Sequence, residues 1–119
     1  MKMKTASLLC SLLALSVGLA QACDVPVAPP TPDGASATLE EMIAAQGEVK
    51  AFQATNADYL TCVDDQMKAE QAAIDEGDNS AQERYALAAA DYNAAVSREE
   101  QVAADFNSAI RAFKEANPD

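Results

Sequence analysis

Apolar and polar residues alternate at intervals of three and four over two long stretches of the chain, residues 38–75 and 81–116. In the first stretch the expected seam, part of it polar, consists of Leu39, Met42, Gln46, Val49, Gln53, Asn56, Leu60, Val63, Met67, Glu70 and Ile74. In the second it consists of Tyr85, Ala89, Tyr92, Val96, Glu99, Ala103, Phe106, Ile110 and Phe113. A heptad repeat is typical of helices that pack along one seam. The pattern therefore predicts two helices of about 36 residues, each roughly 54 Å long.

Local signals place the helix ends. Thr38 followed by Glu41 has the spacing of a capping box, and Ser80 followed by Glu83 repeats it. Between the two stretches, residues 76–80 contain a glycine and several short polar side chains, which favour a turn. The predicted fold is all-α: a long antiparallel two-helix hairpin, similar to a coiled coil, over residues 38–119.

The turn also predicts the register of the two helices. Folding the chain about residues 77 and 78 places Phe106 opposite Val49, and Glu99 opposite Asn56. We expect Glu99 and Asn56 to form a polar layer in the middle of the seam, which fixes the register at some expense in stability.

Residues 23–37 differ in composition from the helical region. They contain four prolines and then Asp33-Gly34, which favours an extended polyproline conformation that ends in a turn. Alanine dominates from Thr38 onward, and the next proline is Pro118. We therefore predict an extended, proline-rich N-terminal strap rather than a further domain.

Residues 1–22 have the organisation of a secretory signal peptide. Two early lysines precede an apolar run of a dozen residues, and the segment ends in Ala-Gln-Ala. The apolar run is shorter than the roughly 20 residues that a membrane-spanning helix needs. We expect cleavage between Ala22 and Cys23, and a periplasmic or secreted protein.

Charge narrows the choice of partners. After residue 22 the chain has six basic and nineteen acidic residues, a net charge of −13. Such a surface repels phosphate backbones and anionic lipid headgroups. We expect no nucleic-acid partner, and no membrane association unless Cys23 carries a lipid.

Two cysteines, Cys23 and Cys62, remain after signal cleavage. In an oxidising compartment they are expected to form a disulfide, which requires the strap to lie nearly straight along the first helix. Small side chains on that helix offer a shallow groove for it: Ala44, Ala51, Thr55, Cys62 and Ala69. The alternative is a lipoprotein anchored through Cys23, although the residues before this cysteine lack the leucine of a typical lipobox.

No pattern in the sequence indicates catalysis, a cofactor or a metal site. The chain contains no histidine, which excludes histidine-dependent nucleophilic and metal sites. The adjacent carboxylates Glu40-Glu41, Asp64-Asp65 and Glu99-Glu100 point about 100° apart on a helix, so neither member of a pair can act as a close acid/base partner of the other. Apart from Glu99 in the polar layer, we expect them to face solvent. The acidic turn at residues 75–79 lacks the ligand spacing of a calcium loop.

Several segments of the first half resemble small exported proteins of Gram-negative bacteria that lack an assigned activity. The resemblance rests on Cys23, Pro32-Asp33-Gly34, Glu40-Glu41-Met42, Ala45-Gln46, Val49-Lys50, and Phe52 through Tyr59-Leu60 to Cys62. It implies a periplasmic location and two paired cysteines, and it supplies no catalytic residues.

These observations together predict an exported, non-enzymatic helical protein that acts by protein contact in the cell envelope. A periplasmic chaperone or stress-binding protein is one alternative, and the lipoprotein is another. Homodimerisation through the helical seam would supply apolar burial that a lone hairpin lacks.

Overall fold

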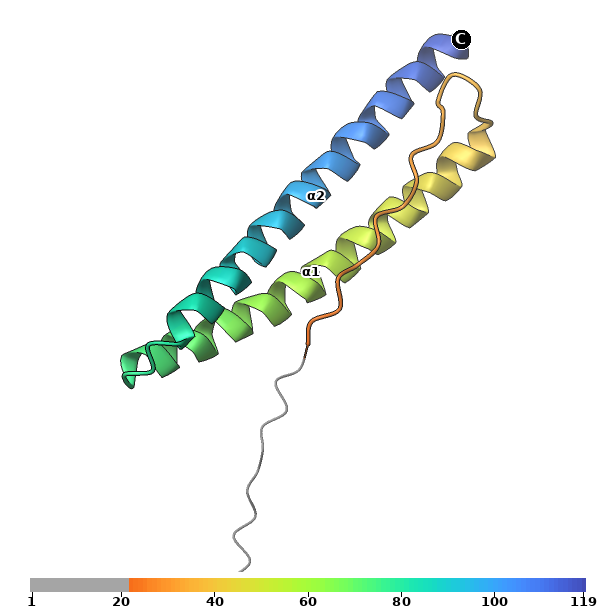
Figure 1. Ribbon diagram of the computed structural model, residues 1–119. Coiled ribbons are helices and arrows are strands. Elements are labelled where there is room, and N and C mark those ends of the chain that lie inside the picture. Colours follow the sequence, from red (N-terminus) through yellow and green to blue (C-terminus); the bar gives the residue numbers. More distant parts are fainter. Residues whose placement is uncertain (1–21) are drawn as a thin grey trace, which may run out of the picture.

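The computed structural model describes residues 22–119 as two long antiparallel helices with an extended segment beside them (Figure 1). Helix α1 spans Leu39–Asp75 and helix α2 spans Ala81–Ala116. Over residues 22–119 there is no β-strand. The predicted all-α hairpin is confirmed. The predicted signal segment lies outside the described residues except for Ala22, at the beginning of the extended segment.

A reciprocal pair of hydrogen bonds fixes the start of α1. The backbone N–H of Glu41 donates to Thr38 Oγ1 at 3.2 Å, and the backbone N–H of Thr38 donates to Glu41 Oε2 at 2.7 Å. Two donors that the first helical turn leaves without partners are thereby satisfied. The capping box predicted at this position is present.

The second predicted capping box is wrong. Ser80 makes no side-chain cap, because its own backbone is already helical and its hydroxyl oxygen accepts Arg84 Nη1 at 2.9 Å instead of a backbone N–H. The hydroxyl itself donates to Asp78 Oδ1 at 2.6 Å. The same carboxylate oxygen accepts the backbone N–H of Ser80 at 3.0 Å. Gly77 completes the turn with a φ of 96°, a conformation that side-chain-bearing residues rarely adopt.

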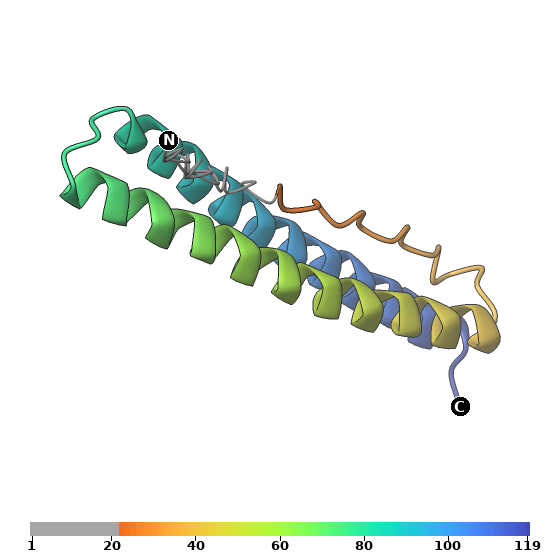
Figure 2. The same ribbon diagram turned by 90° about the horizontal axis from the view of Figure 1, so that it is seen from below.

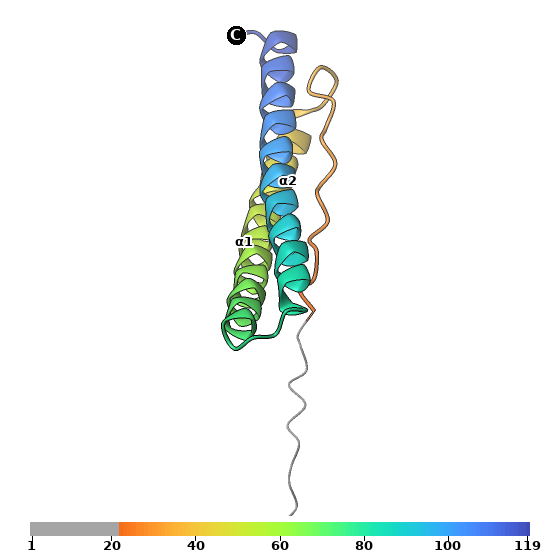
Figure 3. The ribbon, with the colours of Figure 1, turned by 60° about the vertical axis from the view of Figure 1, so that its left-hand side comes forward.

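Residues 22–37 form the strap, which lies along one side of the helix pair (Figures 2 and 3). It turns back toward α1 at Asp33, whose carboxylate accepts the N–H of Ala35 at 3.1 Å and the hydroxyl of Ser36 at 3.0 Å. Pro26 and Gly34 are buried. The strap is therefore a packed third element of the fold.

Two apolar clusters form the core, one toward each end of the molecule. The cluster near the free helix ends contains Met42 and Phe106, with Val49 and Phe113 packed against it. The cluster nearer the turn contains Tyr59, Val63, Ala88 and Ala95, with Cys23 and Tyr92 against it. These groupings agree with the register predicted by counting outward from the turn.

The predicted seam, in contrast, is displaced at alternate positions: Gln46 is exposed, whereas Leu60 and Ile110 are only partly buried and pack against the core. On α1 the buried side chains include Ala45, Phe52 and Tyr59, each one residue before the expected Gln46, Gln53 and Leu60. On α2 the buried residues are Ala81, Ala88, Ala95, Val102, Phe106 and Ala109. The strap explains this displacement, because Cys23 and Ala37 pack against the two clusters and Phe52 lies beside Pro26. Each helix is turned so that it faces both the other helix and the strap.

Candidate functional site

A disulfide joins the start of the strap to the middle of α1. Cys23 and Cys62 are bonded, with their Cα atoms 5.8 Å apart. The predicted staple is confirmed. Of the small residues expected to receive the strap, Ala51, Thr55 and Cys62 line hollows beside it, whereas Ala69 lies beyond its end.

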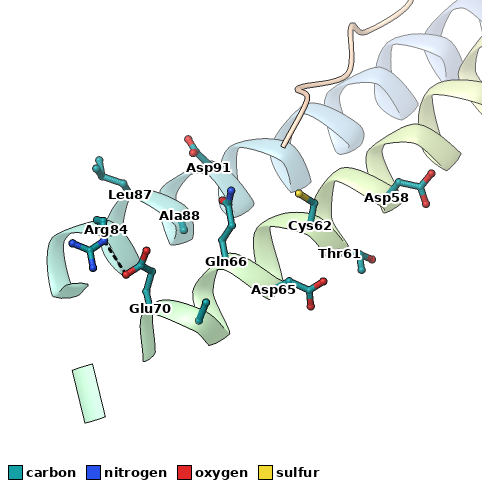
Figure 4. Close-up of a pocket in the computed structure, with 11 residues that line it drawn as sticks. Asp58, Thr61, Cys62, Asp65, Gln66, Glu70, Arg84, Leu87, Ala88 and Asp91 are labelled. Atoms are coloured by element: carbon teal, nitrogen blue, oxygen red, sulfur yellow. Dashed lines mark hydrogen bonds and ion pairs between the residues drawn. The ribbon is translucent and has the colours of Figure 1, made fainter. Parts of the chain in front are cut away.

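The strap leaves the last three turns of α1 uncovered, and there a groove opens between the two helices (Figure 4). It has a volume of about 760 Å³ and is named here the turn-end groove. Its lining consists of Asp58, Thr61, Cys62, Asp65, Gln66, Ala69, Glu70, Arg84, Leu87, Ala88 and Asp91.

Helix geometry sets the shape of the groove. Asp58 and Asp65, two turns apart on α1, lie along one rim, and Asp91 lies on the opposite rim on α2 (Figure 4). Cys62 and Ala88 lie between the rims. The side chain of Gln66 extends from α1 toward α2 beside them (Figure 4), so the groove has a floor of mixed polarity, with one sulfur atom, between two acidic edges.

An ion pair closes the groove toward the turn. Arg84 Nε lies 2.9 Å from Glu70 Oε2, and the far nitrogen of the guanidinium lies 3.0 Å from Asp78 Oδ2. Hydrogen bonds to Asp78 and then to Glu70 raise the pKa of Arg84. Bonds from Ser80 and then from Arg84 lower the pKa of Asp78. Arg84 is therefore held by acidic groups of the protein itself and ties α2 to both α1 and the turn.

One member of each adjacent carboxylate pair has an identifiable structural partner. Glu41 caps α1, Asp64 lies 2.7 Å from Lys68 Nζ, and Glu99 accepts a hydrogen bond from Asn56. The hydrogen bond to Asp64 raises the pKa of Lys68. These three carboxylates therefore contribute to the helices and to the packing between them.

Two aromatic side chains of the predicted seam belong to the apolar core. Phe106 is buried, and Tyr92 packs against the cluster near the turn. In residues 22–119, no three cysteine or carboxylate side chains are arranged to hold a metal ion. No helix in this described part is long and apolar enough to cross a membrane.

Reasoning from the sequence missed the turn-end groove. Its rims combine Asp65 and Asp91, which are far apart in the chain and do not form a motif. One signal was available: Cys62 anchors the strap well before α1 ends at Asp75, so a staple at this position leaves the end of the hairpin uncovered.

Comparison with known proteins gives no relative: no protein-family model, curated protein or solved structure matches the chain. The resemblance to small exported Gram-negative proteins remains a prediction.

Proposed function

We propose that this chain is an exported, non-enzymatic protein of the periplasm or the extracellular space that acts by contact with another protein in the cell envelope. The turn-end groove carries the proposal, because it is a preformed concave surface that the protein's own strap leaves open. Concave, largely preformed surfaces are the usual places where ligands bind.

The disulfide supports the proposed location. Disulfides persist in oxidising compartments and are rare where glutathione and thioredoxin keep thiols reduced. A bond between Cys23 and Cys62 therefore fits export, in agreement with the signal-like segment before Cys23. It also occupies the Cys23 sulfur to which a lipoprotein would attach its lipid, which favours the unlipidated form.

The second candidate function is that of a chaperone-like or stress-binding protein. The strap favours it, because an extended polypeptide segment already packs against the two helices. A chaperone would hold many clients, whereas an envelope accessory factor would hold a defined partner. Suppression of aggregation of several unrelated unfolded proteins would identify the chaperone.

Site-specific crosslinking in the native host tests the proposal. A photoreactive amino acid replaces Leu87 in the groove, and in a matched strain it replaces Glu115 near the far end of α2. We expect a discrete heteromeric adduct from position 87 and none from position 115. Absence of adducts from position 87, and from further positions spread over both helices, would contradict a role by protein contact.

Two simpler measurements test location and assembly. The intact mass of the protein from its host should begin at Cys23 and gain two alkyl groups only after reduction; added acyl chains would identify the lipoprotein instead. Sedimentation analysis tests the homodimer predicted for the helical seam.

A further inference from the structure

We propose that the turn-end groove binds an extended peptide segment with basic side chains, placed as a continuation of the strap. This inference rests on the proposed function and names the chemistry of the partner. The strap itself shows how an extended chain packs on these helices, with Pro26 buried and Cys23 in contact with the core cluster near the turn.

The groove and the path of the strap are continuous. The hollow at the beginning of the strap is lined by Cys23, Asp58 and Cys62, and the last two of these also line the turn-end groove. A ligand in the groove would therefore lie next to Cys23, at the beginning of the strap. It would lie over the same helix pair and meet a similar surface.

Charge selects a basic ligand. Four carboxylates line the groove, and Arg84 is its single cationic side chain, already bound to Glu70 and Asp78. Asp58, Asp65 and Asp91 are exposed to solvent. A second copy of this acidic chain would bring like charges together, whereas lysine or arginine side chains would meet complementary potential on both rims.

The apolar side chains that line the groove favour a ligand that also has apolar side chains. Leu87, which lines the groove, is 61% exposed, and Ala88, next to it in the chain, is only 7% exposed. An apolar ligand side chain between Leu87 and Ala69 would remove this surface from water. A merely polycationic ligand would leave it exposed.

The dimensions suit a short polyproline-like segment. Asp58 and Asp65 are seven residues apart on α1, which is about 10 Å along the axis. Residues three apart in a polyproline helix are separated by about 9 Å. From Asp58 to Glu70 the groove side of α1 extends about 18 Å, enough for roughly six residues in this conformation. The matching ligand has a basic residue at every third position.

The test uses the full protein with its disulfide formed and a fluorescent probe peptide, Arg-Pro-Leu-Arg-Pro-Leu. The control peptide replaces both arginines by glutamate. We expect saturable binding of the arginine peptide that weakens as salt is raised, and no binding of the glutamate peptide. Failure of the arginine peptide to bind, or equal binding of both peptides, would overturn the inference.

Matched variants distinguish the groove from the general acidity of the protein. The groove variant carries Asp65→Asn and Asp91→Asn, and the control carries Glu100→Gln and Glu115→Gln, exposed positions that do not line the groove. Both pairs change the net charge equally. The groove variant should weaken binding about fivefold, as expected for the loss of two exposed ion pairs, and the control less than about twofold. Equal weakening would show attraction to overall charge and overturn the inference.

Two further readouts separate the outcomes. A helical circular dichroism spectrum and an unchanged melting temperature would show that the variants remain folded. In addition, Leu87→Ser should weaken binding of the arginine peptide without any change in the charge of the protein. If the peptide does not bind although the photoreactive group at position 87 still captures a partner, the inference fails and the proposed function stands. If the peptide does not bind and no photoreactive position on either helix captures a partner, both fail.

Discussion

Asn56 on α1 and Glu99 on α2 form a hydrogen bond across the helix pair, with 2.9 Å between Asn56 Nδ2 and Glu99 Oε2. Asn56 is 0% exposed, and its amide also donates to the backbone oxygen of Ala95 at 3.2 Å. Its own side-chain oxygen has no hydrogen-bond partner. The polar layer predicted from the register is therefore present, and it leaves one buried acceptor unsatisfied.

The polar layer should tolerate apolar substitution only when Asn56 and Glu99 are replaced together. Asn56→Leu alone removes the donor from the partly buried Glu99 carboxylate and should lower the free energy of unfolding by about 1–3 kcal/mol. Adding Glu99→Leu should restore stability to the wild-type level or above, because two apolar groups then replace an imperfectly paired polar set. Urea unfolding of both variants measures the difference.

The same pair tests whether the layer fixes the register. The double variant should show extra amide peaks in a two-dimensional nuclear magnetic resonance spectrum, because a uniform apolar seam permits more than one alignment. A double variant less stable than the single variant would show that the polar layer is a net source of stability.

The register of the hairpin was predictable because it depends only on the number of residues between each position and the turn. Once the turn is placed near Gly77, each residue of one helix has one partner at the same distance from the turn, and Asn56 meets Glu99. The start of α1 was equally predictable, since the capping box at Thr38 depends on residues three apart. The capping box depends only on residues close together in the chain, and the register depends only on the position of the turn.

The displaced seam and the groove depend on contacts that are distant in the chain. In an alanine-rich helix such as α2, the neighbours Ala88 and Ala89 are equivalent in hydropathy, so packing against α1 and the strap decides which of them is buried. At the turn, the oxygen of Ser80 accepts a hydrogen bond from Arg84 and does not form the expected cap. The buried face of α2 and the missing cap both depend on which neighbouring groups a residue contacts. The spacing of apolar residues within one helix does not predict these contacts.

Loss of the disulfide should destabilise the whole fold. The bond joins residues 39 apart in the chain, and a loop of this size corresponds to about 4 kcal/mol in the chain-entropy model. Replacing Cys23 and Cys62 by serine should therefore lower the free energy of unfolding by about that amount, measured by urea unfolding. Wild-type protein in excess reductant should match the variant. A difference below about 1 kcal/mol would show that strap packing alone holds the segment in place.

The pH dependence of stability should include a contribution from Asp78. Its pKa lies below the ordinary value of 3.8 because Ser80 and then Arg84 bind the ionised carboxylate. A lowered folded-state pKa gives stability that is fully present above the unfolded-state value and is lost as the pH falls through the folded-state value. Asp78→Asn should thus show a smaller loss of stability between pH 5 and pH 2 than the wild type, measured as urea midpoints. Identical slopes for Asp78→Asn and the wild type would contradict a role for this carboxylate.

Gly34 and Gly47 provide a matched test of strap packing, because the same substitution should have opposite effects at the two positions. A Cβ on Gly34 would overlap the backbone oxygen of Ala109, whereas a Cβ on Gly47 meets nothing within 4 Å. Gly34→Ala must push the strap away from α2 and should lower the melting temperature. Gly47→Ala, inside α1, should stabilise the protein by about 1 kcal/mol through helix propensity. Thermal unfolding measures both variants. Should Gly34→Ala melt at the wild-type temperature, the close contact between the strap and α2 would be excluded as a source of stability, and the displaced seam would need another cause.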